Sequence, residues 1–141
     1  MSGQSCEARV TKSGNVIKEW CESKIGDQTG RVFVITGATN GIGFESADAL
    51  AEHGATVVLA SRNLERTEQC AEKLRTKHGN QNILPVKLDL SSLKSIHQAA
   101  DTIKAQVGNI DVLINNAGVM VPPYTVTEDG FELQFGTNHL G

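Results

Sequence analysis

The chain has 141 residues, of which 39% are hydrophobic and 21% charged, and its formal net charge at pH 7 is -3. This length and composition fit one globular domain with one core. The 13 basic residues are scattered and form no basic stripe, so neither nucleic acid nor an anionic membrane is expected as a partner.

The cysteines and the first residues bear on the cellular compartment. Cys6, Cys21 and Cys70 cannot all pair, and they lack the CxxC spacing and neighbouring histidines of a zinc site, so no metal is expected. A reducing compartment is the simpler interpretation. The first residues include no apolar signal region, and no apolar stretch reaches the ~18 residues of a spanning helix. The sequence therefore predicts a soluble, cytoplasmic protein without a transmembrane segment.

Residues 1–29 differ from the rest and are expected to form a leader. Four of its residues recur at helical spacing, with charged residues on the other face: Val16, Ile17, Trp20 and Cys21. This pattern predicts an amphipathic helix. A membrane-surface or partner-binding helix is one interpretation, but its charges balance, whereas interfacial helices usually carry a cationic face. A helix packed on the following domain is therefore the preferred interpretation.

Residues 30–141 alternate short apolar runs with polar amphipathic segments. The apolar runs predict buried parallel strands at 32–35, 56–60, 83–88 and 110–114. The intervening segments predict helices at 41–53, 63–78 and 91–107, with Asn63 and either Ser91 or Ser92 as N-caps and a glycine just past each end. Strand-helix units in series imply right-handed crossovers, so the predicted fold class is α/β with a doubly wound parallel sheet.

Two further segments follow the fourth predicted strand. The loop 117–124 contains Pro122 and Pro123, which forbid a helix, and its apolar side chains are unusual for a plain surface loop. We therefore expect this loop to flank the functional site. A last helix is expected from Glu128 onward, with Thr127 as its N-cap.

A glycine loop, Thr36-Gly37-Ala38-Thr39-Asn40-Gly41-Ile42-Gly43, joins the first predicted strand to the first predicted helix. In such a loop Gly37 allows a sharp turn, Gly41 a close approach to a pyrophosphate, and Gly43 close packing of the helix on the sheet. The helix N-terminus then offers free N–H groups to phosphates. Glycines also serve turns for purely conformational reasons, but this position between strand and helix is the context that a phosphate-binding loop requires.

The second predicted strand ends at Ser61 and Arg62, about 20 residues after the glycine turn, where an NAD site normally has Asp or Glu on the ribose. A carboxylate there would repel the extra phosphate of NADP, whereas a guanidinium can pair with it. The alternative is that Arg62 merely starts a solvated helix. With the glycine loop upstream, the sequence predicts that NADP(H) is preferred over NAD(H).

Polar residues also end the third and fourth predicted strands. Asp89 is either the cap of the helix beginning near Ser91 or an acceptor for an adenine amino group, and the two roles are compatible. Asn115-Asn116-Ala117-Gly118 places two amides and a glycine at the same sheet edge. Amides can fix neighbouring strands and a nicotinamide ribose without adding charge, although an isolated tetrapeptide of this kind could be a simple turn.

Together, Thr36-Gly37-xxx-Gly41-x-Gly43, Asp89-Leu90, Asn115-Asn116-Ala117-Gly118 and Asn138-xx-Gly141 resemble the pattern of the short-chain dehydrogenase/reductase family. Ser61-Arg62-Asn63 and the segment 129–141 are similar to the branch of retinol dehydrogenases and the WW-domain oxidoreductase. The resemblance runs from about residue 30 to residue 141. It implies an incomplete Rossmann sheet of about four strands in the order 3-2-1-4.

The resemblance also implies roles for single residues. The glycine loop would hold the pyrophosphate, Arg62 the 2′-phosphate, Asp89 the adenine, and Asn115 with Ala117 the nicotinamide side. The cofactor-binding residues expected in full are Thr36, Gly37, Asn40, Gly41, Ile42, Gly43, Ser61, Arg62, Asp89, Leu90, Asn115, Asn116, Ala117 and Gly118. Asn138 matches the family's catalytic asparagine, which serves a Tyr-xxx-Lys pair while a serine polarises the substrate carbonyl.

The matching serine, tyrosine and lysine are absent. Tyr124, the only tyrosine, precedes Asn138 whereas the family's tyrosine follows it, so we interpret Tyr124 as a loop residue near the substrate cleft. The sequence thus predicts the N-terminal NADP(H)-binding portion of an oxidoreductase for alcohols or carbonyls, with retinoids and steroids as candidates. These 141 residues alone are expected to be inactive. A small lipophilic substrate is expected only in a full-length form, and the family's usual dimer interface is expected to be incomplete.

Two alternatives to this prediction stay open. One is a natural truncated form that binds nucleotide or regulates a relative without catalysis. The other is an unrelated nucleotide-binding module without redox chemistry, which the matches at residues 115–118 and at Asn138 disfavour.

Overall fold

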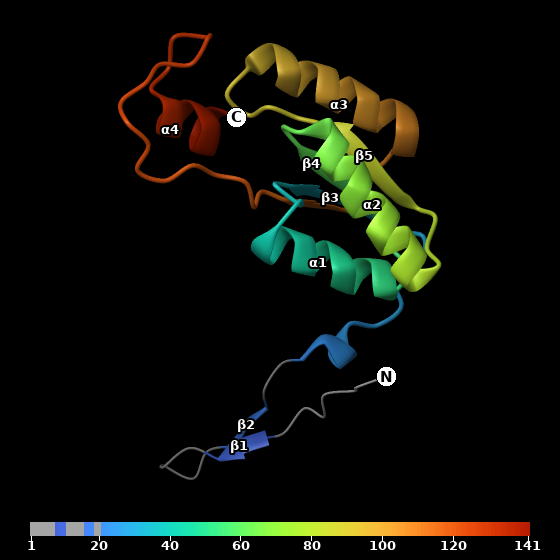
Figure 1. The fold of residues 1–141 in the computed structure, drawn as a ribbon. Helices are drawn as coiled ribbons and strands as arrows, with labels where there is room; N and C mark the ends of the chain where they lie inside the picture. The colour runs from blue at the N-terminus through green and yellow to red at the C-terminus, as the bar shows by residue number, and fades with distance from the viewer. Residues whose placement is uncertain (1–7, 11–15, 19–20) are drawn as a thin grey trace.

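Four parallel strands form the central sheet of the chain (Figure 1). The structure is a computed structural model that describes residues 8–10, 16–18 and 21–141. The strands of this sheet are β3 (Val32–Thr36), β4 (Thr56–Ser61), β5 (Ile83–Lys87) and β6 (Val112–Ile114), and they lie in the order β5-β4-β3-β6. Counted from β3 along the chain, this is the order 3-2-1-4, so the predicted doubly wound topology is confirmed.

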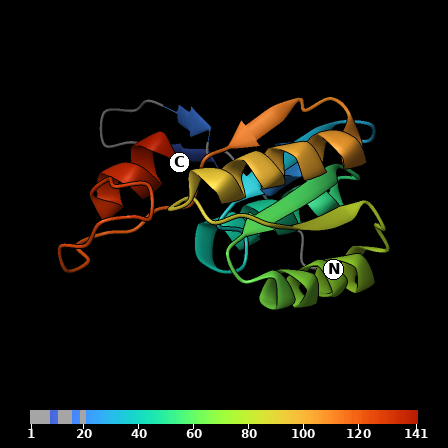
Figure 2. The ribbon, with the colours of Figure 1, turned by 90° about the horizontal axis from the view of Figure 1, so that it is seen from above.

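Long helices cover both faces of the sheet (Figure 2). Helices α1 (Gly41–Glu52) and α2 (Leu64–His78) share one hydrophobic cluster with the sheet, and α3 (Leu93–Val107) shares the other. Successive residues of a strand point to opposite faces. Val57 therefore lies in the cluster with α1 and α2 and Val58 in the cluster with α3, and both are fully buried. Burial on both faces explains why β3 and β4 are continuous apolar runs. The expected burial is wrong for the edge strand β6, where Leu113 is 55% exposed.

Side-chain caps fix where two of the long helices begin. Asn63 Oδ1 accepts a hydrogen bond from the Arg66 backbone N–H at 3.0 Å and caps α2, and Ser92 Oγ accepts one from the Ser95 N–H at 3.3 Å and caps α3. Gly79 ends α2 in the left-handed region at φ 66, which is a common helix ending. These capping predictions are confirmed, with Ser92 rather than Ser91 as the cap of α3.

The last helical segment begins later than the sequence predicted. The prediction of a helix from Glu128 with Thr127 as its cap is wrong. Gly130, at φ 86, turns the chain, and the Thr127 N–H donates a hydrogen bond to the Phe131 carbonyl at 2.7 Å. Helix α4 (Leu133–Phe135) instead follows Glu132, whose carboxylate accepts hydrogen bonds from the Gln134 and Phe135 backbone N–H groups and caps the helix. The chain continues as η2 (Gly136–Leu140), a π-helical turn.

The leader differs from its expected helix. Val16–Lys18 form strand β2, which pairs antiparallel with β1 (Ala8–Val10), so a helix is wrong for these three residues. β-branched residues such as Val and Ile favour strands over helices, and pairing with a second segment reinforces that preference. A short 3-10 helix, η1 (Glu22–Lys24), follows. Trp20, which the expected helix included, lies outside the described residues.

The two described cysteines differ in state. Cys21 is disulfide-bonded, which differs from the reduced state that the cysteine pattern favoured, and Cys70 is a free thiol. Across the described ranges, no helix has both the length and the apolar character needed to cross a bilayer. Nor do these ranges contain a group of three or more His, Cys, Asp or Glu side chains able to hold a metal ion.

A charged cluster ties α1 to the end of α2, and it should make stability depend on pH. Asp48 bonds Lys77 at 2.5 Å and His78 at 2.7 Å. Burial raises the pKa of Asp48, but the hydrogen bonds and charges of Lys77 and His78 together hold it below its usual value. A carboxylate whose pKa is lower in the folded state than in the unfolded state stabilises the fold at pH values above its unfolded-state pKa, about 3.9. This stabilisation is lost as the pH falls from the unfolded-state pKa through the folded-state pKa.

We therefore expect Asp48→Asn to lower the free energy of unfolding by about 1–2 kcal/mol at pH 7. The cost should begin to shrink below about pH 4, where the carboxylate of the unfolded chain becomes protonated, and it should go on shrinking as the pH falls through the lower folded-state pKa. Urea unfolding at pH 7 and pH 3 measures both quantities. Asp101→Asn, an exposed aspartate of α3 without an ion pair in the described part of the chain, is the matched control. A cost for Asp48→Asn that is as large at pH 3 as at pH 7 would refute this account.

Candidate functional site

A cleft of about 190 Å³ opens where the strands of the sheet end. Parallel strands bring their carboxyl ends to one edge, so residues that are far apart in the sequence meet there. Most of the lining residues were predicted: Thr36, Gly37, Ser61, Arg62, Asp89, Leu90, Ala117 and Gly118. The others were missed: Ala60, Leu88, Val119 and Thr137. Each of these is a direct neighbour of a predicted residue, so adjacency along the chain was the available signal.

Thr36 and Asn116 fasten the end of β3 to the end of β6. The buried Thr36 Oγ1 accepts hydrogen bonds from the Asn116 N–H at 3.1 Å and the Ala117 N–H at 3.0 Å. Asn116 Nδ2 in turn donates to the Thr36 carbonyl at 2.9 Å and the Gly37 carbonyl at 3.3 Å. The expectation that an amide here fixes neighbouring strands is therefore met by Asn116. Its side chain positions the glycine loop and does not line the cleft.

The glycine loop depends on backbone conformations that only glycine adopts without cost. Gly37 and Gly41 have φ values of 68 and 54, in the left-handed region. Gly43 has a different constraint, since a Cβ there would lie 2.7 Å from the Gly37 carbonyl oxygen and closer still to Asn116 Nδ2. Gly37 therefore makes the turn, and Gly43 allows the first turn of α1 to lie against it.

The N-terminus of α1 has no side-chain cap. Its N-cap residue, Asn40, makes no capping hydrogen bond, and the first turn contains no acidic residue. By contrast, α2 and α3 are capped by Asn63 and Ser92. The first N–H groups of a helix have no partner within the helix, and they carry a partial positive charge. Among the three long helices, α1 is thus the one whose N-terminus is open to an anion.

The start of α1 lies beside Gly37 and comprises Asn40, Gly41, Ile42 and Gly43. None of these four residues lines the cleft. The Ile42 side chain is 80% exposed. What this segment can offer a ligand is therefore its backbone.

The charged residues of the cleft differ in how they are held. Arg62 is exposed, and no carboxylate of the described residues lies within ion-pair distance of it. Asp89 Oδ1 accepts hydrogen bonds from the Ser91 N–H at 3.0 Å and the Ser91 hydroxyl at 2.6 Å. Asp89 therefore closes the turn before α3, and the helix cap itself is Ser92. The other Asp89 oxygen makes no hydrogen bond within the described ranges, so it is available to a ligand.

Three further predicted residues lie elsewhere. Asn115 does not line this cleft but a separate pocket of about 230 Å³ beside α3, among apolar residues such as Ile96 and Leu113. Asn138 is also outside the cleft, and its side-chain amide pairs with the backbone of Val119. Its Oδ1 accepts a hydrogen bond from the Val119 N–H at 2.8 Å, and its Nδ2 donates one to the Val119 carbonyl at 2.7 Å. Tyr124 is 83% exposed and is also outside the cleft.

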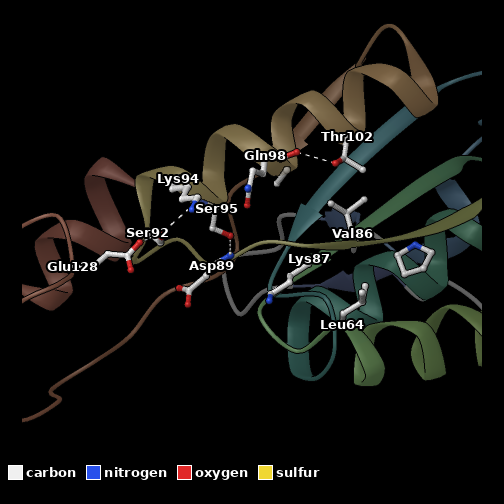
Figure 3. Close-up of a pocket in the computed structure, with 12 residues that line it drawn as sticks. Leu64, Val86, Lys87, Asp89, Ser92, Lys94, Ser95, Gln98, Thr102 and Glu128 are labelled. Carbon is white, nitrogen blue, oxygen red and sulfur yellow. Dashed lines mark hydrogen bonds between the residues drawn. The ribbon is translucent and has the colours of Figure 1, made fainter.

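A wider pocket of about 600 Å³ lies along the outer strand β5 and shares Asp89 with the cleft. Figure 3 shows the side chains of α3 facing Val86, Lys87 and Leu64 across this pocket. Lys87 and Lys94 are in its lining, but so are Asp89 and Glu128, so its charges offset each other. The unpaired Arg62 in its lining makes the smaller cleft the better site for an anionic ligand, and the open N-terminus of α1 lies next to its lining residue Gly37.

Comparisons with known proteins agree with this geometry. The family model described as short chain dehydrogenase matches residues 31–141. Human retinol dehydrogenase 11 is 52% identical over 112 residues, which are 79% of this chain and 35% of that protein. An uncharacterized oxidoreductase of Schizosaccharomyces pombe is 39% identical over 142 residues, covering 94% of this chain and 42% of its own length. The chain thus spans about a third of the retinol dehydrogenases it matches.

Solved structures give the same result. An uncharacterized protein from Mycobacterium paratuberculosis superposes with a TM-score of 0.75 at 41% identity, covering 86% of this chain and 42% of that chain. The L-sorbose reductase of Gluconobacter frateurii, solved as a complex with NADPH and L-sorbose, superposes with a TM-score of 0.61 at 33% identity. That match covers 66% of this chain and 35% of the reductase.

Proposed function

This chain belongs to the short-chain dehydrogenase family, whose N-terminal region it matches, and from that premise we propose that its cleft binds NADP(H) in preference to NAD(H). The bound cofactor would serve an oxidoreductase that moves hydride between nicotinamide and an alcohol or carbonyl. Arg62 carries the proposal, because it is an unpaired cation in the cleft at the end of β4, where an NAD site would have a carboxylate.

The residues present fit this cofactor. Gly37 and Gly43 keep the loop free of side chains where a Cβ would strike backbone atoms or Asn116. The uncapped N–H groups at the start of α1 would be available to a diphosphate. Arg62 would pair with the 2′-phosphate through charge-assisted hydrogen bonds. The free oxygen of Asp89 would accept from the adenine amino group. Asn116 and Asn138 act through other residues, since they hold the glycine loop and the loop after β6 in place.

The substrate belongs to the proposal as well. Several curated relatives are named retinol dehydrogenases, which supports a lipophilic alcohol or aldehyde such as a retinoid as the substrate of the longer protein. The exposed apolar side chains of Met120 and Val121, in the loop after β6, lie beside cleft residues Gly118 and Val119. This loop would therefore contribute to an apolar approach to the cofactor.

A fluorescence titration of this chain with NADPH and NADH tests the proposed cofactor. We expect NADPH to bind at least about tenfold more tightly, because hydrogen bonds to a charged group contribute about 1.5–3 kcal/mol. Raising the salt concentration should narrow the difference, since the Arg62 pair is exposed to solvent. Equal affinities for the two cofactors would refute the proposed preference.

We also expect these 141 residues to give no dehydrogenase turnover above the blank with any alcohol or aldehyde. The only tyrosine of the sequence, Tyr124, is 83% exposed and outside the cleft, so no phenol is placed to exchange a proton with a substrate there. NADPH consumption with retinal and simpler aldehydes measures this. A rate that scales with protein and disappears in Tyr124→Phe would show that the interpretation of Tyr124 is wrong.

A further inference from the structure

One buried hydroxyl at the cleft has no hydrogen-bond partner. Among the described residues, Thr137 Oγ1 is the one buried side-chain oxygen or nitrogen atom without a hydrogen-bond partner. Thr137 is also a lining residue of the cleft. A buried polar group without a partner is costly, and native structures contain few of them. An unpaired group beside a binding cleft is a reason to ask which ligand would pair with it.

Comparison with other helical threonines shows why Thr137 is unusual. Thr67 in α2 donates its hydroxyl to the Asn63 carbonyl at 2.7 Å, and Thr102 in α3 donates to the Gln98 carbonyl at 2.8 Å. Both bonds reach the carbonyl four residues earlier, which is the ordinary partner of a helical threonine. Thr137 makes no such bond.

The π-helical turn accounts for this difference. Thr137 lies in η2, whose wider winding displaces the preceding carbonyls from their α-helical positions. Short π-helical turns occur frequently at functional sites. The turn is also anchored, because the neighbouring Asn138 holds the backbone of Val119, another lining residue of the cleft, through two hydrogen bonds. The fold therefore holds Thr137 at the cleft while leaving its hydroxyl unpaired.

We infer that Thr137 is a further dinucleotide-contacting residue, whose hydroxyl hydrogen-bonds the adenosine part of the cofactor. This inference rests on the proposed NADP(H) function. Thr137 shares the cleft with Asp89 and Arg62, the residues assigned to the adenine and to the 2′-phosphate. A hydroxyl both donates and accepts, so it can pair with adenine nitrogens or with ribose oxygens.

The test compares Thr137→Val with Thr137→Ser in this chain, using two measurements that should move in opposite directions. Without ligand, Thr137→Val should melt at the same temperature as wild type or higher, because it removes an unpaired buried hydroxyl. With ligand, the same variant should bind NADPH about threefold to tenfold more weakly, the value of one neutral hydrogen bond. Thr137→Ser keeps the hydroxyl and should bind NADPH within about twofold of wild type.

Thr67→Val is the matched control, since it removes a buried helical hydroxyl that does have a partner and lies outside the cleft. It should lower the melting temperature and leave the NADPH affinity unchanged. Adenosine 2′,5′-bisphosphate, which lacks the nicotinamide half, identifies the end of the cofactor that is contacted. Thr137→Val should weaken its binding by the same factor as that of NADPH.

The possible failures are distinguishable. Wild type that fails to bind NADPH at all would overturn the proposed function, and the inference with it. Wild type that binds while Thr137→Val binds equally well would overturn only the role of Thr137. If Thr137→Val bound NADPH more weakly but bound adenosine 2′,5′-bisphosphate as tightly as wild type, the assignment of the Thr137 contact to the adenosine part would be overturned. If Thr137→Val does not fold, loss of affinity in Thr137→Ala with retention in Thr137→Ser decides the same question.

Discussion

Replacing Arg62 by glutamate is expected to reverse the cofactor preference of this chain. The affinity for NADPH should fall about a hundredfold or more, while the affinity for NADH stays within about threefold of wild type. Loss of the charge-assisted bonds accounts for about 1.5–3 kcal/mol, and repulsion between the new carboxylate and the 2′-phosphate adds about 1 kcal/mol at the surface. Titration with both cofactors at low and high salt measures the change, and salt should reduce it.

The controls separate a local effect from a change in overall charge. Arg66→Glu introduces the same charge change on an exposed residue of α2 that does not line the cleft. It should alter NADPH binding by no more than about twofold through long-range electrostatics. Arg62→Gln should abolish the preference without reversing it, because it removes the cation and adds no anion. A fall in NADPH affinity that is equal in Arg62→Glu and Arg66→Glu would contradict a specific role for Arg62.

Gly43→Ala is expected to be a severely damaging single-methyl change. The added Cβ would lie 2.7 Å from the Gly37 carbonyl oxygen and nearer to Asn116 Nδ2, which is closer than real Cβ atoms approach such groups. Because the Gly37 oxygen is part of the backbone, it cannot swing aside, and α1 must move away from the glycine loop. We expect a loss of about 2–3 kcal/mol in the free energy of unfolding, together with loss of NADPH binding.

Two other glycines provide the comparison for this prediction. Gly26→Ala meets no atom within 4 Å and has no positive φ, so it should change the stability by less than about 0.5 kcal/mol. Gly41→Ala also has open space but sits at φ 54, and the left-handed conformation should cost about 1 kcal/mol. Urea unfolding of the three variants gives the order. If Gly43→Ala cost no more than Gly41→Ala, backbone conformation rather than close packing would explain the glycine loop.

The strands and the starts of α2 and α3 could be predicted because local signals determine them, whereas the order of the strands followed from the resemblance to a known family. The buried strands are continuous apolar runs, and side chains next to the helices, those of Asn63 and Ser92, supply their caps. Most of the cleft could be predicted for the same reason, since a parallel sheet brings every strand end to one edge.

Other features depend on pairing between distant segments or on exact side-chain direction. The four spaced residues of the leader were too few to distinguish a helix from strand β2, whose partner is another segment. The turn at Gly130 competes with the predicted cap at Thr127 and delays the last helix. Asn115 and Asn116 are identical neighbours, yet one lines a pocket beside α3 and the other holds the glycine loop. The unpaired hydroxyl of Thr137 requires a π-helical turn that no residue pattern predicted.

The uncapped start of α1 has a consequence for the amount of protein that a cell retains. A ligand that binds only the folded chain stabilises it by mass action, by about 2.7 kcal/mol when its concentration is a hundred times its dissociation constant. Small domains have a total stability of only about 5–15 kcal/mol, so this share is large. Cofactor supply would then govern how often the chain unfolds and meets a protease. Variants that weaken cofactor binding should shorten the lifetime of the protein as well as its occupancy.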